Sequence, residues 1–156
     1  MKKKILSLLL VAGLSVSLFA GCGSGAADAD KATAEGGKEA ASDLKIGAIL
    51  IGDETETYSK AHIDGIKEAA KELGIPENNI EWKERIDESE DCYDAAKALV
   101  ADGCTLVISN SYGHQDYIAE AAEEFTDVNF VSMTGDYAAI SGLDNYYNAF
   151  TNVYES

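Results

Sequence analysis

Side chains that could bind a small polar molecule are concentrated in three loops of the sequence. Residues 52–58, 110–114 and 133–137 each follow a short apolar run and contain amide, hydroxyl, carboxylate or aromatic groups. A few such groups, placed together, are enough to orient a polar or ring-bearing ligand. The candidate ligand-binding residues are Asp53, Tyr58, Asn110, Ser111, Tyr112, Gly113, Thr134 and Gly135.

Each candidate also has a structural interpretation, which the sequence leaves open. The Tyr58 ring could stack on a ligand or pack against its own lobe. Asp53 could bind a polar edge of the ligand or remain solvated. Residues 110–113 could contact a ligand or form a capped turn. Residues 134–135 could likewise contact a ligand or simply end the preceding strand. We expect Asp116 to cap the helix that follows rather than to touch a ligand.

The motifs of common catalytic and cofactor-binding sites are missing from the sequence. There is no G-x-x-x-x-G-K-[ST] phosphate loop, no G-x-G-x-x-G after the first apolar run and no G-x-S-x-G turn. His62 and His114 lie far apart and have no second metal ligand at helical spacing, and we expect His62 to face the interior. Carboxylates occur throughout the chain, so we expect Glu88–Glu90 and residues 123–124 to be solvated. We predict no catalytic residue, no metal and no cofactor.

Apolar patterning predicts the elements that position the three loops. Short apolar runs alternate with segments of helical periodicity that end at Gly74 and Gly103, which predicts an α/β fold with a parallel sheet and helices on both faces. In such sheets ligands bind beyond the carboxyl ends of the strands. Residues 151–156 resemble the start of a further helix. The predicted strands are 45–51, 80–86, 106–109, 128–132 and 146–150, and the predicted helices are 59–73, 89–102 and 115–125.

The first residues have the pattern of an export signal. Lys2–Lys4 form a positive region, and Ile5–Phe19 form an uncharged apolar segment that is short for a membrane-spanning helix. Leu18–Cys22 resembles a bacterial lipobox, so we predict a lipoprotein signal peptide over residues 1–21 and lipidation of Cys22. The alternative is an ordinary signal followed by a cysteine that occurs there by chance.

From Cys22 onward the composition differs from that of the apolar signal segment. Residues 22–43 are rich in Gly, Ala and charged residues and lack aromatic and branched aliphatic side chains, as expected of a flexible tether. Residues 44–156 form the predicted domain. Together these segments predict a lipid-anchored protein on the extracytoplasmic face of a bacterial cell membrane.

The charge balance restricts the partners. The chain has 12 basic and 28 acidic residues and a net charge of −16, which disfavours nucleic acid and anionic lipid surfaces as partners. A helix between Cys92 and Cys104 would separate them by roughly 18 Å, well beyond disulfide range. We therefore expect two buried free thiols.

Three stretches together resemble the basic membrane protein family, the purine-nucleoside-receptor-like class of substrate-binding lipoproteins of ABC importers. The first is KIGAILIGD with Tyr58 and Gly65 following it at the family's spacing. The second is residues 106–135, LVISNSYGHQDYIAEAAEEFTDVNFVSMTG, and the third is the aromatic segment Tyr147–Tyr154. Ser59 departs from the nucleoside-binding branch, which has Asn at this position.

The resemblance implies the amino-terminal lobe of a two-lobed type I periplasmic-binding-protein fold. It implies a small-molecule ligand, such as a nucleoside or similar ring compound, with ABC permease subunits as partners. It also implies that the sequence is a piece of a longer protein. The alternatives are a surface receptor or regulatory lipoprotein of the same fold, a type I binding protein for a sugar-like ligand, and an enzyme of flavodoxin-like topology.

Overall fold

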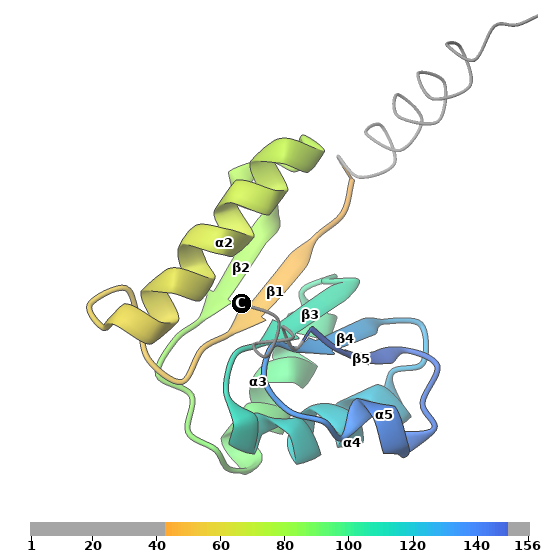
Figure 1. Ribbon diagram of the computed structural model, residues 1–156. Helices are drawn as coiled ribbons and strands as arrows, with labels where there is room; N and C mark the ends of the chain where they lie inside the picture. Colours follow the sequence, from red (N-terminus) through yellow and green to blue (C-terminus); the bar gives the residue numbers. More distant parts are fainter. Residues whose placement is uncertain (1–42, 150–156) are drawn as a thin grey trace, which may run out of the picture.

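The short apolar runs form the strands of one parallel sheet. The computed structural model describes residues 43–149, and the strands lie in the order β2-β1-β3-β4-β5 (Figure 1). Every neighbouring pair of strands is parallel, which confirms the predicted sheet. The strands are β1 (Ile46–Ile49), β2 (Ile80–Lys83), β3 (Leu106–Ser109), β4 (Asn129–Ser132) and β5 (Tyr146–Asn148).

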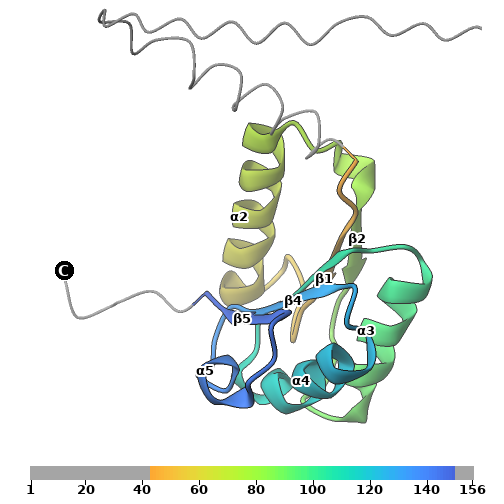
Figure 2. The same ribbon diagram turned by 90° about the vertical axis from the view of Figure 1, so that its right-hand side faces the viewer.

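Helices cover both faces of the sheet, but unequally. Figure 2 shows α2 on one face and α3, α4 and α5 on the other. The sequence analysis did not predict α5, because four residues are too few to show a helical period. None of the helices between residues 43 and 149 has the length and apolar character needed to cross a membrane. The helices are α2 (Thr57–Leu73), α3 (Glu90–Ala101), α4 (Gln115–Glu124) and α5 (Ala138–Ser141), with 3-10 turns η1 (Glu77–Asn79) and η2 (Tyr112–His114).

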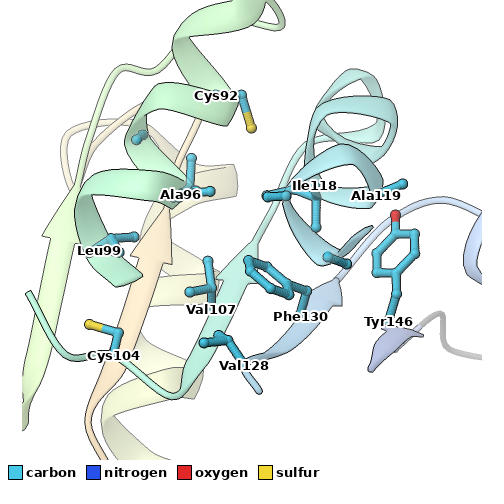
Figure 3. Close-up of a cluster of buried hydrophobic side chains, with 14 residues drawn as sticks. Cys92, Ala96, Leu99, Cys104, Val107, Ile118, Ala119, Val128, Phe130 and Tyr146 are labelled. Carbon is cyan, nitrogen blue, oxygen red and sulfur yellow. The ribbon is translucent and has the colours of Figure 1, made fainter. Parts of the chain in front are cut away.

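The larger hydrophobic core lies between the sheet and the pair α3–α4. Figure 3 shows Leu99 of α3 and Ile118 of α4 facing Val107 and Phe130 of the sheet, and all four side chains are fully buried. Gly47 allows this approach, because a Cβ at that position would lie 2.7 Å from a methyl group of Leu99. A smaller core lies between the sheet and α2.

Several predicted ends of elements are confirmed. α2 stops at Gly74, which has φ 76°, and the Ser89 hydroxyl accepts a hydrogen bond from the Asp91 N–H at the start of α3. β2 lies at an edge of the sheet and ends at residue 83 rather than at the predicted residue 86, and the backbone enters the left-handed region at Arg85.

The prediction that Asp116 caps α4 is wrong. Asp116 lies in the first turn of α4, and the helix start has no side-chain cap. The 3-10 turn η2 leads directly into α4, so backbone carbonyls of Ser111 and Tyr112 accept the N–H groups of His114 and Gln115 instead.

The predicted signal, tether and lipidation site, and the predicted helix at 151–156, lie outside the described residues.

Candidate functional site

The loops after β1, β3 and β4 meet at the carboxyl edge of the sheet, and Asn110 joins them. The Asn110 side chain is almost fully buried. Its Oδ1 accepts a hydrogen bond from the Ile51 N–H at 2.9 Å, and its Nδ2 donates to Ser59 Oγ at 3.2 Å. Both ends of the amide are therefore hydrogen-bonded within the protein. In this structure Asn110 positions Ile51 and Ser59.

Tyr58 lies in the first turn of α2 at the same edge. The Glu56 carboxylate fixes this turn by accepting the N–H groups of Tyr58 at 2.9 Å and Ser59 at 2.5 Å. The Tyr58 hydroxyl donates to the Asn110 carbonyl, and Thr134 Oγ1 donates to that same carbonyl at 2.7 Å. Tyr58 remains 43% exposed, so an aromatic residue is held at this edge with part of its surface open to solvent.

His62 packs edge-on against the Tyr58 ring, with the ring centroids 4.7 Å apart. Its Nε2 is buried without a hydrogen-bond partner, and burial lowers the pKa of the imidazole. The expectation that His62 faces inward holds for this nitrogen. The neutral imidazole of His62 therefore packs against the Tyr58 ring and helps to hold it in place.

Asp53 is buried and paired rather than solvated. Its carboxylate accepts hydrogen bonds from the Thr55 N–H at 2.8 Å and the Thr55 hydroxyl, and from Arg85 Nε at 2.5 Å. These bonds, from Thr55 first and then from Arg85, lower the pKa of Asp53 to about 2. Arg85 was not among the predicted residues, although it is the only arginine in the sequence.

Glu88 is exposed, as predicted, and its carboxylate also binds the loop after β3. Its Oε1 accepts hydrogen bonds from Ser111 Oγ at 2.5 Å and from the Gly113 N–H at 2.9 Å. The Ser111 hydroxyl, followed by the Gly113 N–H, lowers the pKa of Glu88. A Cβ on Gly113 would overlap this carboxylate. The donors predicted for a ligand are thus occupied by Glu88 in this structure.

A cavity of about 370 Å³ opens beside these loops. Gly135 at its wall has φ 127°, and a Cβ there would lie 2.5 Å from Gln115 Oε1. That oxygen accepts the backbone N–H groups of Asp136 at 3.2 Å and Tyr137 at 3.1 Å, which fixes the turn after β4. The sequence analysis did not identify Asp136 and Asn148. The cavity is lined by Tyr112, Gly135, Asp136, Ala139 and Asn148.

Two further hollows differ in position: one lies at the opposite edge of the sheet, and the other extends along α2 as far as Met133, which follows β4. A cavity of about 490 Å³ lies between the end of α2 and the start of β2, at the opposite edge of the sheet, and contains none of the predicted residues. An apolar groove of about 370 Å³ runs between α2 and the sheet, lined in part by His62, Leu106, Ile108 and Met133.

The side chains at the carboxyl edge are suited to binding. The loops there present the exposed side chain of Tyr58, and the cavity beside them is lined by the Tyr112 ring, the Asp136 carboxylate and the Asn148 amide. Within residues 43–149, no group of three or more His, Cys, Asp or Glu side chains is placed to hold a metal ion.

Comparisons with known proteins establish the fold. No family model matches the sequence, and no curated protein is found to match it. Among solved structures, the chain is similar to an ABC transporter solute-binding protein from Conexibacter woesei DSM 14684. The identity is 19% and the TM-score 0.57, over 67% of this chain and 34% of that one. It is also similar to a transcriptional activator of the comK gene from Bacillus halodurans, with 20% identity and a TM-score of 0.50, over 59% of this chain and 30% of that one.

These likenesses confirm an α/β fold of the type I periplasmic-binding-protein kind. The chain spans about a third of the length of the two structures.

Proposed function

We propose that this chain is the amino-terminal lobe of a solute-binding lipoprotein of an ABC importer, related to the basic membrane protein family. It captures an uncharged ring-bearing solute such as a nucleoside and performs no catalysis. The observation that carries this proposal is the exposed Tyr58 side chain, fixed at the carboxyl edge of the sheet by the hydrogen bond from its hydroxyl to the Asn110 carbonyl. The similarity to a solved ABC solute-binding protein supports the same function.

Two other functions use the same edge of the sheet. A surface receptor or regulatory lipoprotein would bind a ligand there without a permease. A binding protein for a sugar-like ligand would use the hydroxyl and carboxylate groups, since sugars also stack on aromatic rings. A permease and an ATPase encoded beside the gene would favour import over the receptor.

Removing the Tyr58 ring tests the position of the ligand. A single lobe covers one side of a solute, so we expect weak binding of nucleosides, with Kd on the order of 1 mM. Because stacking contributes roughly 0.5–1.5 kcal/mol beyond area burial, Tyr58→Ala should raise Kd roughly two- to tenfold or more. Titration of the full chain, followed by NMR chemical shifts, measures both values.

The matched control is Tyr147→Ala. The Tyr147 ring is 48% exposed, close to the value for Tyr58, and its hydroxyl donates to the Asp144 carbonyl before β5, away from the carboxyl edge. We expect this variant to bind as the wild type does. Absence of nucleoside binding, or equal Kd values for Tyr58→Ala and wild type, would overturn the proposal.

We also propose that Cys22 carries the lipid anchor, because it follows an apolar segment and the small residues Ala20 and Gly21. Cys22→Ala should release the protein from membranes, whereas Ser24→Ala should leave it bound. Cell fractionation measures the distribution. A Cys22→Ala protein that stays with the membrane would refute the anchor.

A further inference from the structure

Asp136 is the only charged residue among those described that line the carboxyl-edge cavity. Its backbone is fixed, because its N–H donates to Gln115 Oε1 at 3.2 Å. Its carboxylate has one long contact, with the Tyr112 hydroxyl at 3.5 Å. Both Asp136 and Tyr112 are exposed at the cavity mouth. A rigid backbone thus presents a carboxylate whose oxygens are nearly free to accept hydrogen bonds.

Two other carboxylates near this edge, Asp53 and Glu88, are already occupied. Asp53 is bound by Thr55 and Arg85, and Glu88 is bound by Ser111 and Gly113. Each of them therefore fixes the shape of a loop, whereas Asp136 has acceptor capacity left over for a ligand.

We propose that Asp136 is a ligand-binding residue that selects for the chemistry of the solute. This rests on the proposed function of the site. The two carboxylate oxygens accept a pair of adjacent N–H or O–H donors on a neutral or cationic ring-bearing solute. An adjacent donor pair occurs on the guanine base edge and on the ribose diol. The same carboxylate repels an anionic solute, and among the described residues no lysine or arginine lines the cavity to offset it.

The experiment uses the full chain and four probes: guanosine, inosine, 2′,3′-dideoxyguanosine and guanosine 5′-monophosphate. Inosine lacks one donor of the base edge, and the dideoxy compound lacks the diol, so these two distinguish the sources of the donor pair. The wild type should bind guanosine more tightly than the monophosphate. It should bind one of the two depleted probes more weakly than guanosine.

Asp136→Asn should weaken guanosine binding about tenfold, because a hydrogen bond to a charged acceptor is lost. It should also reduce the discrimination against the monophosphate, which a purely structural role would not do. Asp127→Asn is the control: it makes the same charge change just before β4, at the opposite edge of the sheet, and should alter neither value.

The outcomes separate the two proposals. If no probe binds the wild type, the proposed function and the role of Asp136 both fail. If guanosine binds and Asp136→Asn changes neither its affinity nor the discrimination against the monophosphate, the role of Asp136 alone is overturned. The same holds if Asp127→Asn changes both values as much as Asp136→Asn does.

Discussion

At the scale of single residues, the pair Asp53–Arg85 shows how this edge of the sheet is fixed. The Asp53 side chain is 8% exposed and the Arg85 side chain 75% exposed. Arg85 has φ 57°, a left-handed conformation that costs a non-glycine residue roughly 1–2 kcal/mol. The ion pair and the bond from the Arg85 N–H to the Gly52 carbonyl at 3.1 Å hold it there. The loop after β2 is thereby tied to the loop after β1.

Asp53→Asn should change how stability depends on pH. The pKa of Asp53 is about 2 in the folded protein, below the ordinary value of 3.8. The unfolded chain therefore takes up the proton first as the pH falls, and stability is lost between about pH 4 and pH 2. Asp53→Asn should be less stable at pH 7 and lack this part of the acid dependence. Urea unfolding at several pH values measures it.

The control for Asp53→Asn is Asp127→Asn, which should keep the wild-type slope between pH 4 and pH 2. An unchanged slope in Asp53→Asn would show that another group is responsible for the acid dependence.

Sequence reasoning located the edge but not all of its contacts. Tyr58, Asn110 and Thr134 could be predicted to meet, because each follows a strand of one parallel sheet and the carboxyl ends of such strands align. The contacts of Arg85 and Glu88 could not be predicted, because an ion pair or a hydrogen bond between distant loops leaves no periodicity in the sequence. The single arginine was the one available signal.

At the scale of elements, two glycines that differ in backbone conformation and in the space around them test how the turn after β4 is built. Gly135 has φ 127° and no room for a Cβ, whereas Gly65, on α2, has nothing within 4 Å of the Cβ position. Gly135→Ala should destabilise the protein by about 1–3 kcal/mol through strain and overlap. Gly65→Ala should stabilise it by about 0.5–1 kcal/mol, since alanine favours a helix.

Thermal or urea unfolding of both glycine variants measures the difference. Destabilisation of similar size in both would mean that backbone conformation at residue 135 is not what defines this turn.

The helix α5, which the sequence did not predict, follows the same turn. The Tyr137 N–H just before α5 donates to Gln115 Oε1 at 3.1 Å, and the Ala138 N–H at its start donates to Asn148 Oδ1 at 2.9 Å. Contacts of this kind, rather than helix propensity, decide such a short element.

At the scale of the whole molecule, the direction of winding places the site. From β1 the chain crosses to β2 on one side, and from β2 it returns past β1 to β3 and continues to β5. Right-handed crossovers then put α2 alone on one face and the later helices on the other. The winding reverses between β1 and β3, and their carboxyl ends lead to Tyr58 and Asn110. The alternation of strands and helices could be predicted from sequence, and the candidate site at the carboxyl edge is a hypothesis drawn from it.

The burial of the two thiols has a consequence for how fast the protein must fold. Cys92 and Cys104 are free and almost fully buried, as expected, and burial raises the pKa of Cys92 to about 12. Figure 3 places both sulfurs within the larger core. Only an exposed thiolate reacts readily with oxidants, so the native fold itself shields them. Under the export that we propose, the thiols stay reduced only if the core assembles faster than oxidants reach the unfolded chain. The speed of core assembly therefore becomes a requirement for the chain's chemical integrity.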